Sequence, residues 1–494
     1  MKLVIDNRTG YLNDYYFQTL CLLYFPGEKF PASPAPDAPE AVVGFTGTPD
    51  GFSCTVRLRV NGRIADGAFS SAGYRFALPL AAEDRAQITA GRAFLDAGGK
   101  LFGFLPPWGC ITGLRPAKRA RYFLARGNSE DRVRALFADD YLVSPAKTEL
   151  TMRTAARETA LLADVSPDCC GLYVSVPFCP TRCAYCSFVS YSNRKLFALI
   201  PDYLDKLLGD IRETADLISS LGLRLSAVYI GGGTPSILDA AQTERLFSAL
   251  SDCAERFGVP EFTYESGRPD TTTAEKLAVA KRCGVNRVSI NPQSTCDAVL
   301  ERIGRRHTAA DFFRAVDAAH RVGFDCLNAD LIAGLPGDTR ERFAQSLSDV
   351  LGCGFENVTV HTLSIKNASP IRFSDESVYD AEGVFARACV DYAYERLSGE
   401  GYAPYYFYRQ KNTVGNAENT GYSKVGAEGI YNILMMEEYT SVFACGAGAI
   451  TKLVSPDKQV IERLAHPKYP FEYLGLNRGL RTDEVRNFYG RYFE

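Results

Sequence analysis

The sequence lacks a charge excess, a long apolar run and a leader pattern, and each absence excludes a class of protein. Among 494 residues, 55 are basic and 58 acidic, so the formal net charge is only −3. Such a balance gives no overall electrostatic attraction to nucleic acid or to an anionic membrane. No run of 18 apolar residues occurs, and we expect no membrane span. Residues 1–14 lack the residue order of a signal peptide, so we expect a cytoplasmic protein.

Cysteine, in contrast, is plentiful, with 15 residues. A chain that is 46% hydrophobic and long enough for two or three domains can build a large core, which needs no disulfide framework. Because the cytosol keeps thiols reduced, we predict free cysteines. Most of them, including Cys253, Cys283, Cys326 and Cys389, lie in apolar contexts and are predicted to be small core side chains.

The middle of the chain alternates between short β-rich runs and helix-like segments. Six such units in succession predict an α/β fold with a parallel sheet, either open and doubly wound or a partial (βα)6 barrel. Both arrangements place ligands at the carboxyl ends of the strands, and the strands are expected to be continuously apolar. The β-rich runs are residues 172–178, 227–233, 261–266, 287–292, 327–336 and 357–365.

The regions on either side have a different pattern. Upstream, SCTVRLRVNGRIADGAF alternates in polarity and turns at Asn61-Gly62, which predicts a β-hairpin followed by a helix. We therefore predict an N-terminal α+β domain at 1–145 and the barrel at 165–400. Downstream, residues 401–494 are predicted to form a C-terminal region on the substrate side, because their first part is rich in Tyr, Asn and Gly.

The segment CPTRCAYC, residues 179–186, spaces three cysteines as C-x3-C-x2-C after the first run. Three thiolates leave one position of a four-ligand metal unit free, as catalytic metal sites do. Buried thiols, or a zinc site completed from elsewhere, would be the plainer interpretations. The sharper one is a [4Fe–4S] cluster whose open iron binds S-adenosylmethionine, which the reduced cluster cleaves to a carbon radical. Cys179, Cys183 and Cys186 are then the metal ligands.

Polar residues at the ends of the later strands suit a site for an adenosyl amino acid. GGGTPS at 231–236 lets a backbone approach a ligand closely, although such a turn can be only a tight connection. Glu265, Gln293 and Asp330 lie at or near the ends of the next three strands, where an unpaired buried polar group is costly. Each alone could cap a helix, but together they predict a binding site at one edge of the sheet.

In these motifs the chain resembles radical S-adenosylmethionine enzymes, and among them the oxygen-independent coproporphyrinogen III dehydrogenase family. The likeness covers about Tyr173 to Leu335 and, more weakly, extends to about residue 450. It implies a radical-SAM partial barrel with a [4Fe–4S] cluster on the three cysteines. It also implies that S-adenosylmethionine is contacted by the following residues: Tyr173, Gly232, Gly233, Thr234, Glu265, Gln293, Arg305 and Asp330.

Segments such as CPTRCAYCSF, ESGRPDTTT and IGRRHT are similar to the HemZ-type branch of this family. The chain departs from well-characterised dehydrogenases of the family at Phe188, where they carry a fourth cysteine. That difference weakens the transfer of the dehydrogenase reaction but leaves the radical chemistry in place. Catalytic residues beyond the cluster and cofactor sites are not predicted.

The expected substrate, coproporphyrinogen, is a tetrapyrrole with four carboxylates. Its site should offer Arg or Lys side chains that pair with carboxylates and an aromatic surface, and the segment YYFYRQK offers both. The substrate contacts predicted on this basis are Tyr405, Tyr406, Tyr408, Arg409 and Lys411. A strand with an aromatic inner face is the alternative for this segment. His307 is interpreted as a structural histidine rather than one that orients a ligand.

Three functions follow from the resemblance. The first is oxidative decarboxylation of coproporphyrinogen III propionates to vinyl groups, which forms protoporphyrinogen IX for haem biosynthesis. The second is haem binding and transfer to a client, and the third is a radical reaction on haem itself, by methyl transfer and ring opening. The expected partners are a tetrapyrrole and an electron donor such as flavodoxin or ferredoxin, with no nucleic acid.

Overall fold

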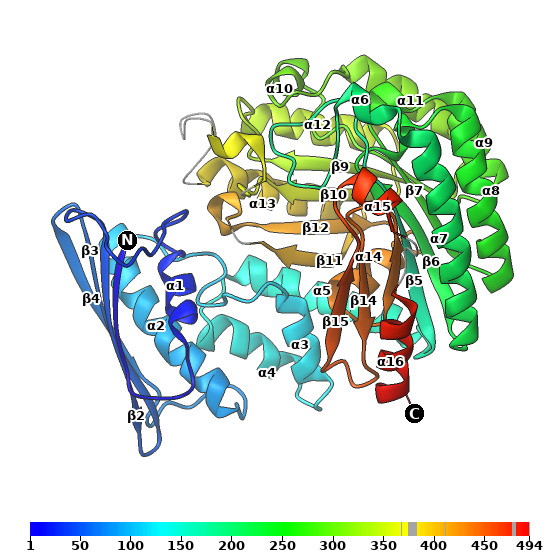
Figure 1. Ribbon diagram of the computed structural model, residues 1–494. Helices are drawn as coiled ribbons and strands as arrows, with labels where there is room; N and C mark the ends of the chain where they lie inside the picture. The colour runs from blue at the N-terminus through cyan, green and yellow to red at the C-terminus, as the bar shows by residue number, and fades with distance from the viewer. Residues whose placement is uncertain (367, 374–382, 411, 477–480, 494) are drawn as a thin grey trace. The chain divides into compact units, whose positions relative to one another are not determined.

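The computed structural model describes residues 1–366, 368–373, 383–410, 412–476 and 481–493. The chain divides into two compact units, one of Met1–Ala156 with Tyr408–Asn416, the other of Arg157–Phe407 with Ala417–Glu494. Figure 1 shows the path of the chain through both units. The larger unit thus takes in most of the residues downstream of 400 together with the strand–helix repeats.

The smaller unit is built on a four-stranded sheet in the order β1-β2-β3-β4 (Figure 1). Its strands are β1 (Lys2–Asn7), β2 (Glu40–Thr48), β3 (Gly51–Val60) and β4 (Arg63–Ser70). The predicted hairpin is β3–β4, and Asn61 and Gly62 at its turn have φ of 48° and 75°, as a tight antiparallel turn requires. Its helices are α1 (Asp14–Cys21), α2 (Ala82–Phe102), α3 (Pro116–Leu124) and α4 (Glu130–Ala135), and α5 spans Pro145–Ala163.

Six parallel strands, hydrogen-bonded in sequence order, form the centre of the larger unit. They are β5 (Cys169–Val176), β6 (Arg224–Gly232), β7 (Glu261–Gly267), β8 (Arg287–Ile290), β9 (Cys326–Ala333) and β10 (Asn357–Thr362). The intervening helices include α7 (Ile200–Ser220), α8 (Ala240–Phe257), α9 (Ala274–Arg282), α11 (Ala309–Val322) and α12 (Arg340–Gly352). The predicted α/β fold with a parallel sheet is confirmed.

Segments downstream of residue 400 extend this sheet to eleven strands. β13 (Val442–Cys445) pairs parallel to β5 and is followed by antiparallel β14 (Ile450–Val454) and β15 (Ile461–Ala465). At the other edge, β12 (Glu418–Ser423) pairs antiparallel to β10, with β11 (Ala403–Arg409) outside it. The helices of this part are α13 (Val384–Gly399), α14 (Ile430–Glu437), α15 (Pro470–Leu474) and α16 (Thr482–Tyr492).

The two faces of the parallel strands differ in polarity, in contrast to the continuously apolar strands expected. Alternate residues such as Val228, Ile230 and Val288 are buried in one large core with the helices, of which Figure 1 shows α7, α8 and α9 along one face of the sheet. The residues between them, which define the inner face, are largely polar. Polar side chains on that face are therefore available for a site.

An aromatic stack covers part of the inner face. Tyr431 of α14 lies against Tyr229 of β6 with ring centroids 4.5 Å apart, and Tyr173 of β5 lies 6.2 Å from both.

Among the described residues, no helix is both long and apolar enough to cross a membrane.

Candidate active site

The three-cysteine segment forms a loop directly after β5, at the carboxyl end of the parallel strands. Backbone hydrogen bonds hold it at several points. The Cys179 N–H donates to the Tyr191 carbonyl at 3.0 Å, the Ala184 N–H to the Ile303 carbonyl at 2.9 Å, and the Cys186 N–H to the Cys183 carbonyl at 3.2 Å. The loop is therefore anchored to segments distant in sequence as well as to its own turn.

The glycine-rich turn after β6 lies directly against this loop. A Cβ on Gly233 would be 2.7 Å from the Phe178 carbonyl oxygen and 3.0 Å from Cys179 Sγ. Gly232 has a φ of 109°, which favours glycine, and a Cβ there would be 2.8 Å from Ser175 Oγ. The glycines thus permit a close approach of backbone to the cysteine loop, and the predicted contact of this turn with a ligand stays a prediction.

The sulfurs themselves are largely shielded from solvent. Cys179 and Cys183 are each 8% exposed. Burial raises the pKa of the Cys179 thiol, partly offset by the hydroxyls of Thr234 and Ser190, and burial also raises the pKa of Cys186. Without a metal the Cys179 and Cys186 thiols favour the protonated form, so metal binding there would be accompanied by proton release.

Within the described residues, no three His, Cys, Asp or Glu side chains converge on a single ion. A [4Fe–4S] cluster binds each of its cysteines through a different iron, so the thiolates that hold it need not converge on one point. The three-cysteine loop is compatible with such a cluster.

Carboxylates from two strands meet on the inner face beside the glycine turn. Glu265 lies two residues before the end of β7, and a Cβ on Gly231 would be 2.6 Å from its Oε2. Asp330 of β9 accepts a hydrogen bond from Asn328 Nδ2 at 2.9 Å and lies 3.6 Å from His361 Nε2 of β10. Burial, followed by the Asp330 charge, raises the pKa of Glu265 to about 7. Sequence reasoning predicted the carboxylates but missed His361, although it also lies near the end of a strand.

Gln293 and Arg305 supply buried polar groups on the loops beyond β8. Gln293 has a φ of 66°, and its Oε1 is buried without a hydrogen-bond partner. Its backbone N–H donates to the Asp330 carbonyl at 2.9 Å. Arg305 is 8% exposed, and it donates to Tyr185 Oη at 3.1 Å and to the Asn291 carbonyl. These groups are buried and polar at the point where a charged ligand was predicted.

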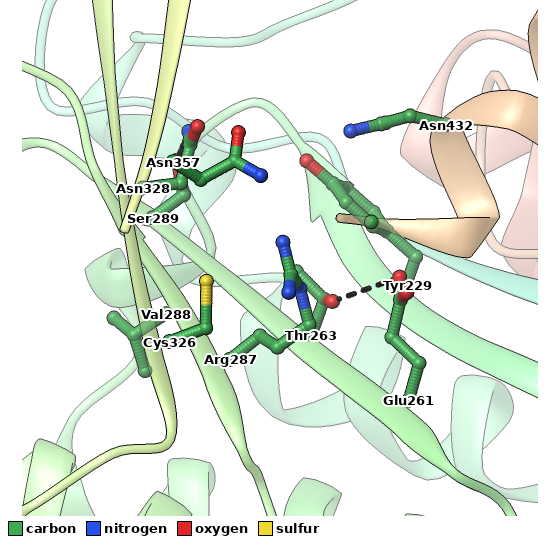
Figure 2. Close-up of a pocket in the computed structure, with 11 residues that line it drawn as sticks. Tyr229, Glu261, Thr263, Arg287, Val288, Ser289, Cys326, Asn328, Asn357 and Asn432 are labelled. Carbon is green, nitrogen blue, oxygen red and sulfur yellow. Dashed lines mark hydrogen bonds between the residues drawn. The ribbon is translucent and has the colours of Figure 1, made fainter. Parts of the chain in front are cut away.

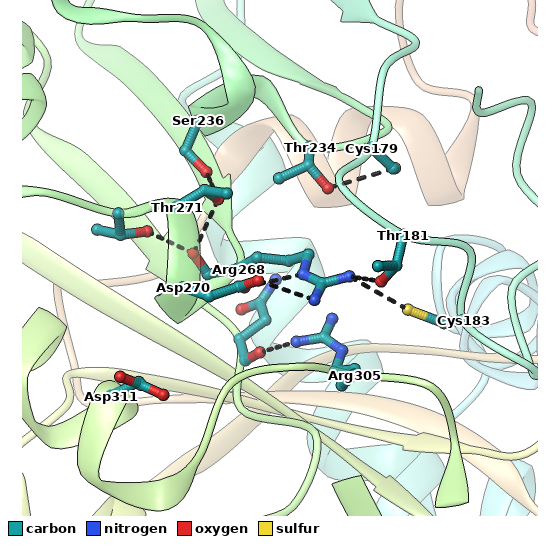
Figure 3. A network of polar contacts seen from close by, with 12 residues as sticks. Cys179, Thr181, Cys183, Thr234, Ser236, Arg268, Asp270, Thr271, Arg305 and Asp311 are labelled. Carbon is teal, nitrogen blue, oxygen red and sulfur yellow. Dashed lines mark hydrogen bonds and ion pairs between the residues drawn. The ribbon is translucent and has the colours of Figure 1, made fainter. Parts of the chain in front are cut away.

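Arg268, which sequence reasoning did not single out, reaches the cysteine loop from the segment after β7 (Figure 3). It pairs with Asp270 and donates to Thr181 Oγ1 at 2.6 Å. Its sequence signals were its position three residues after Glu265 and its place in the segment ESGRPDTTT. Nearby His307 is 2% exposed, and burial together with Arg305 lowers its pKa to about 3. His307 is therefore a neutral, buried side chain, and the structural role expected of it stays a prediction.

A separate polar cavity lies toward the amino ends of the strands (Figure 2). The first residues of β7, β8, β9 and β10 line it, namely Glu261, Arg287, Cys326 and Asn357. The cysteine loop follows the other end of β5, so this cavity and the loop lie toward opposite ends of the strands.

The predicted substrate segment is mostly internal. Tyr405 and Tyr406 are buried, with Tyr405 Oη donating to Asn357 Oδ1 at 3.3 Å, and Tyr408 is half-buried. Arg409 lies over Trp108 with 5.4 Å between guanidinium carbon and ring centroid, and it donates to the Ile111 carbonyl. Lys411 lies outside the described residues. The geometry gives Tyr405 and Arg409 packing partners, and their contact with substrate stays a prediction.

The chain is similar to known proteins in sequence and in fold. Residues 173–350 match the model of the radical SAM superfamily. The chain is 35% identical over 374 residues to the oxygen-independent coproporphyrinogen-III oxidase-like protein HemZ of Bacillus subtilis, covering 75% of each chain. The chain belongs to this HemZ-type family of radical SAM proteins. Members of the superfamily use a [4Fe–4S] cluster and S-adenosylmethionine.

The chain is also similar to two proteins of Escherichia coli, one in sequence and one in fold. The haem chaperone HemW of Escherichia coli is 27% identical over 335 residues, which cover 65% of this chain and 82% of that protein. The solved structure of coproporphyrinogen III oxidase HemN from Escherichia coli, a radical SAM enzyme, superposes with a TM-score of 0.51 at 20% identity. That match covers 69% of this chain and 82% of HemN, and it supports the fold.

The residues present fit both cofactors of the family. The cysteine loop offers three thiols, and the glycine turn packs so closely on that loop that a Cβ on Gly233 would lie 2.7 Å from the Phe178 carbonyl oxygen. Gln293 Oε1 is buried and unpartnered, and Arg305 is buried with its donors on a hydroxyl and a carbonyl. An amino acid carrying an amine and a carboxylate would pair with groups of this kind.

Proposed function

We propose that this chain is a radical SAM enzyme that converts propionates of coproporphyrinogen III to vinyl groups without oxygen. The observation that carries the proposal is the contact between the glycine turn and the cysteine loop, with Thr234 Oγ1 donating to Cys179 Sγ at 3.3 Å. This contact brings the proposed cluster ligands and the proposed cofactor cradle together at one edge of the sheet.

In this proposal Cys179, Cys183 and Cys186 hold the cluster and leave one iron for S-adenosylmethionine. The cofactor is then contacted by residues of five strands and of the segments that follow them: Tyr173, Gly232, Gly233, Thr234, Glu265, Gln293, Arg305 and Asp330. Arg305 pairs with a carboxylate because a buried guanidinium makes its strongest hydrogen bonds to an anion. The carboxylates Glu265 and Asp330 accept hydrogen bonds from amine or hydroxyl groups.

When bound, the cluster and S-adenosylmethionine would supply a 5′-deoxyadenosyl radical able to take a hydrogen atom from a propionate, and the substrate would then lose carbon dioxide and pass one electron to an acceptor. The protein must shield this site from water and from stray reductants. The buried cysteines and the aromatic stack of Tyr173, Tyr229 and Tyr431 contribute apolar cover on the inner face. An electron donor such as flavodoxin or ferredoxin would reduce the cluster.

A second candidate is haem binding and transfer, favoured by one specific feature. Phe188, at the position of the fourth cysteine of well-characterised dehydrogenases, is 69% exposed. An exposed aromatic ring beside the cysteine loop offers surface for a flat macrocycle. The similarity to haem chaperones named HemW supports this candidate as well. Radical methyl transfer that opens haem is a further variant of the same chemistry.

Anaerobic incubation of the reconstituted protein with S-adenosylmethionine, dithionite and coproporphyrinogen III, read by mass spectrometry, separates the candidates. We expect 5′-deoxyadenosine and products lighter by the atoms of formic acid, one carbon dioxide and two hydrogens, for each vinyl group formed. Stable haem binding with unchanged coproporphyrinogen would favour the carrier. Consumption of haem itself, with a methylated or opened ring, would favour the third candidate.

A further inference from the structure

Arg268 places a buried positive charge beside the cysteine loop. The residue is 2% exposed and follows β7. Its Nη1 lies 2.6 Å from Thr181 Oγ1 and 4.0 Å from Cys183 Sγ (Figure 3). Thr181 in turn donates to the Gly304 carbonyl at 3.1 Å. One guanidinium nitrogen is thus directed at the backbone turn that presents the second cysteine.

Asp270 fixes the orientation of this guanidinium. Arg268 Nε lies 2.9 Å from Asp270 Oδ1, and Nη2 lies 3.0 Å from Oδ2, so the pair is bidentate. Because the guanidinium is planar and rigid, two bonds on one side aim the remaining nitrogen in a single direction. Asp270 therefore holds the Arg268 charge in place without covering the side that faces Cys183.

The charged groups near Arg268 include a second buried cation and one paired carboxylate. Arg305 is a second buried cation and donates to Tyr185 Oη, one residue before Cys186. His307 packs among these groups and is neutral near pH 7 because burial and Arg305 lower its pKa. Asp270 is the carboxylate that pairs with Arg268, and it lies on the side of the guanidinium away from the sulfur.

We propose that Arg268 is a positioning residue that stabilises the one-electron-reduced state of a cluster bound at the cysteine loop. Reduction adds a negative charge, and a fixed cation nearby favours the more negative state in a shielded site. Hydrogen bonds and charges near the sulfurs are among the factors that set cluster potentials. The inference rests on the proposed function, because it assumes the cluster ligands named above.

The test uses redox titration with dithionite, followed by electron paramagnetic resonance, on anaerobically reconstituted full-length protein. Arg268→Met removes the charge and should shift the midpoint potential to a more negative value with the iron content retained. Arg268→Lys keeps the positive charge but loses the bidentate guanidinium. Its midpoint potential should lie between those of the wild type and Arg268→Met. Asp270→Asn removes the opposing negative charge and should shift the midpoint to a more positive value.

Arg287→Met is the matched control, because Arg287 is another cation of this unit and lines the cavity near the amino ends of the strands. Its midpoint should equal that of the wild type. An unchanged midpoint in Arg268→Met with full iron would overturn the inference. If that variant loses iron, unchanged midpoints in both Arg268→Lys and Asp270→Asn overturn it instead. A wild-type protein that cannot be reconstituted with four irons would contradict the proposed function itself.

Discussion

The hydroxyl of Thr234 donates a hydrogen bond to Cys179 Sγ across 3.3 Å, although the two residues are 55 positions apart in the chain. Thr234 follows β6 and Cys179 follows β5, so the contact joins the ends of two neighbouring parallel strands. The glycine turn and the cysteine loop therefore form one structural unit. A change in either segment is expected to disturb the other.

Gly233→Ala should impair cluster assembly. The added Cβ would meet the Phe178 carbonyl at 2.7 Å and Cys179 Sγ at 3.0 Å, and the first of these is backbone that cannot move aside easily. We expect a lower iron content after reconstitution, measured by iron and sulfide analysis. Gly209→Ala in α7 is the control, because its Cβ meets nothing within 4 Å. It should keep full iron and gain about 0.5–1 kcal/mol of stability. Equal iron content in the two variants would contradict the close approach.

Cys183→Ala should abolish the cluster. Wild-type protein purified without oxygen is expected to carry about four iron and four sulfide per chain, the stoichiometry of the cluster. Cys253→Ala in α8 is a suitable control, because Cys253 is also buried but lies away from the loop. If the triple variant of Cys179, Cys183 and Cys186 retained its iron, the ligands would have to be other cysteines.

Glu265→Ala and Asp330→Ala should weaken S-adenosylmethionine binding and leave the cluster intact. Each removes a hydrogen-bond acceptor from the inner face, and a bond to a charged partner contributes about 1.5–3 kcal/mol. Calorimetric titration on reconstituted protein measures the loss. Asp325→Ala, just before β9 and exposed, should bind as the wild type does. Unchanged affinity in both inner-face variants would leave these carboxylates with a structural role only.

Glu265→Gln should alter how stability depends on pH. The pKa of Glu265 is raised from 4.5 to about 7, mainly by burial and then by Asp330. Between pH 4.5 and about 7 the folded protein therefore keeps a proton that the unfolded chain releases. The protonated carboxyl thus contributes to the free energy of unfolding, and this contribution is fully present below pH 4.5 and lost as the pH rises through about 7. The loss amounts to at most about 3 kcal/mol, less where water reaches the carboxyl.

Thermal unfolding from pH 5 to 8 measures this effect. The wild-type melting temperature should fall over this range relative to that of Glu265→Gln, which cannot titrate at this position. Asp325→Asn should keep the wild-type profile. Parallel profiles for the wild type and Glu265→Gln would show that the carboxyl does not titrate in this range.

Arg409→Ala and Lys411→Ala test the substrate segment. If these residues pair with propionates, the variants should require more coproporphyrinogen while cleaving S-adenosylmethionine without substrate at the wild-type rate. Because Arg409 also contacts Trp108 and the Ile111 carbonyl, circular dichroism must first show that the variant folds. Loss of both activities together would assign the segment a structural role. No change in either activity, with tight haem binding, would favour the haem carrier.

Much of the larger unit was predictable because its signals are local. The six strand–helix repeats follow from apolar periodicity, and the three-cysteine spacing specifies a metal-binding loop within eight residues. Residues at strand ends, such as Glu265 and Asp330, were predictable because parallel strands bring their carboxyl ends to one edge. Local pattern and the rules of parallel sheets together were enough to predict at which edge of the sheet the site lies.

Tertiary structure decided the features that depend on distant segments. The inner face is polar because α14 and neighbouring strands supply partners for its side chains, which no single strand reveals. The buried Arg268–Asp270 pair appears in the sequence as an ordinary turn, and its direction toward Cys183 depends on how β7 lies beside the loop. The sequence gives no sign of a packing partner for Arg409, yet this residue packs on Trp108, 301 positions earlier. Burial and charge pairing are properties of the folded neighbourhood, so a sequence determines them only through the contacts that folding creates.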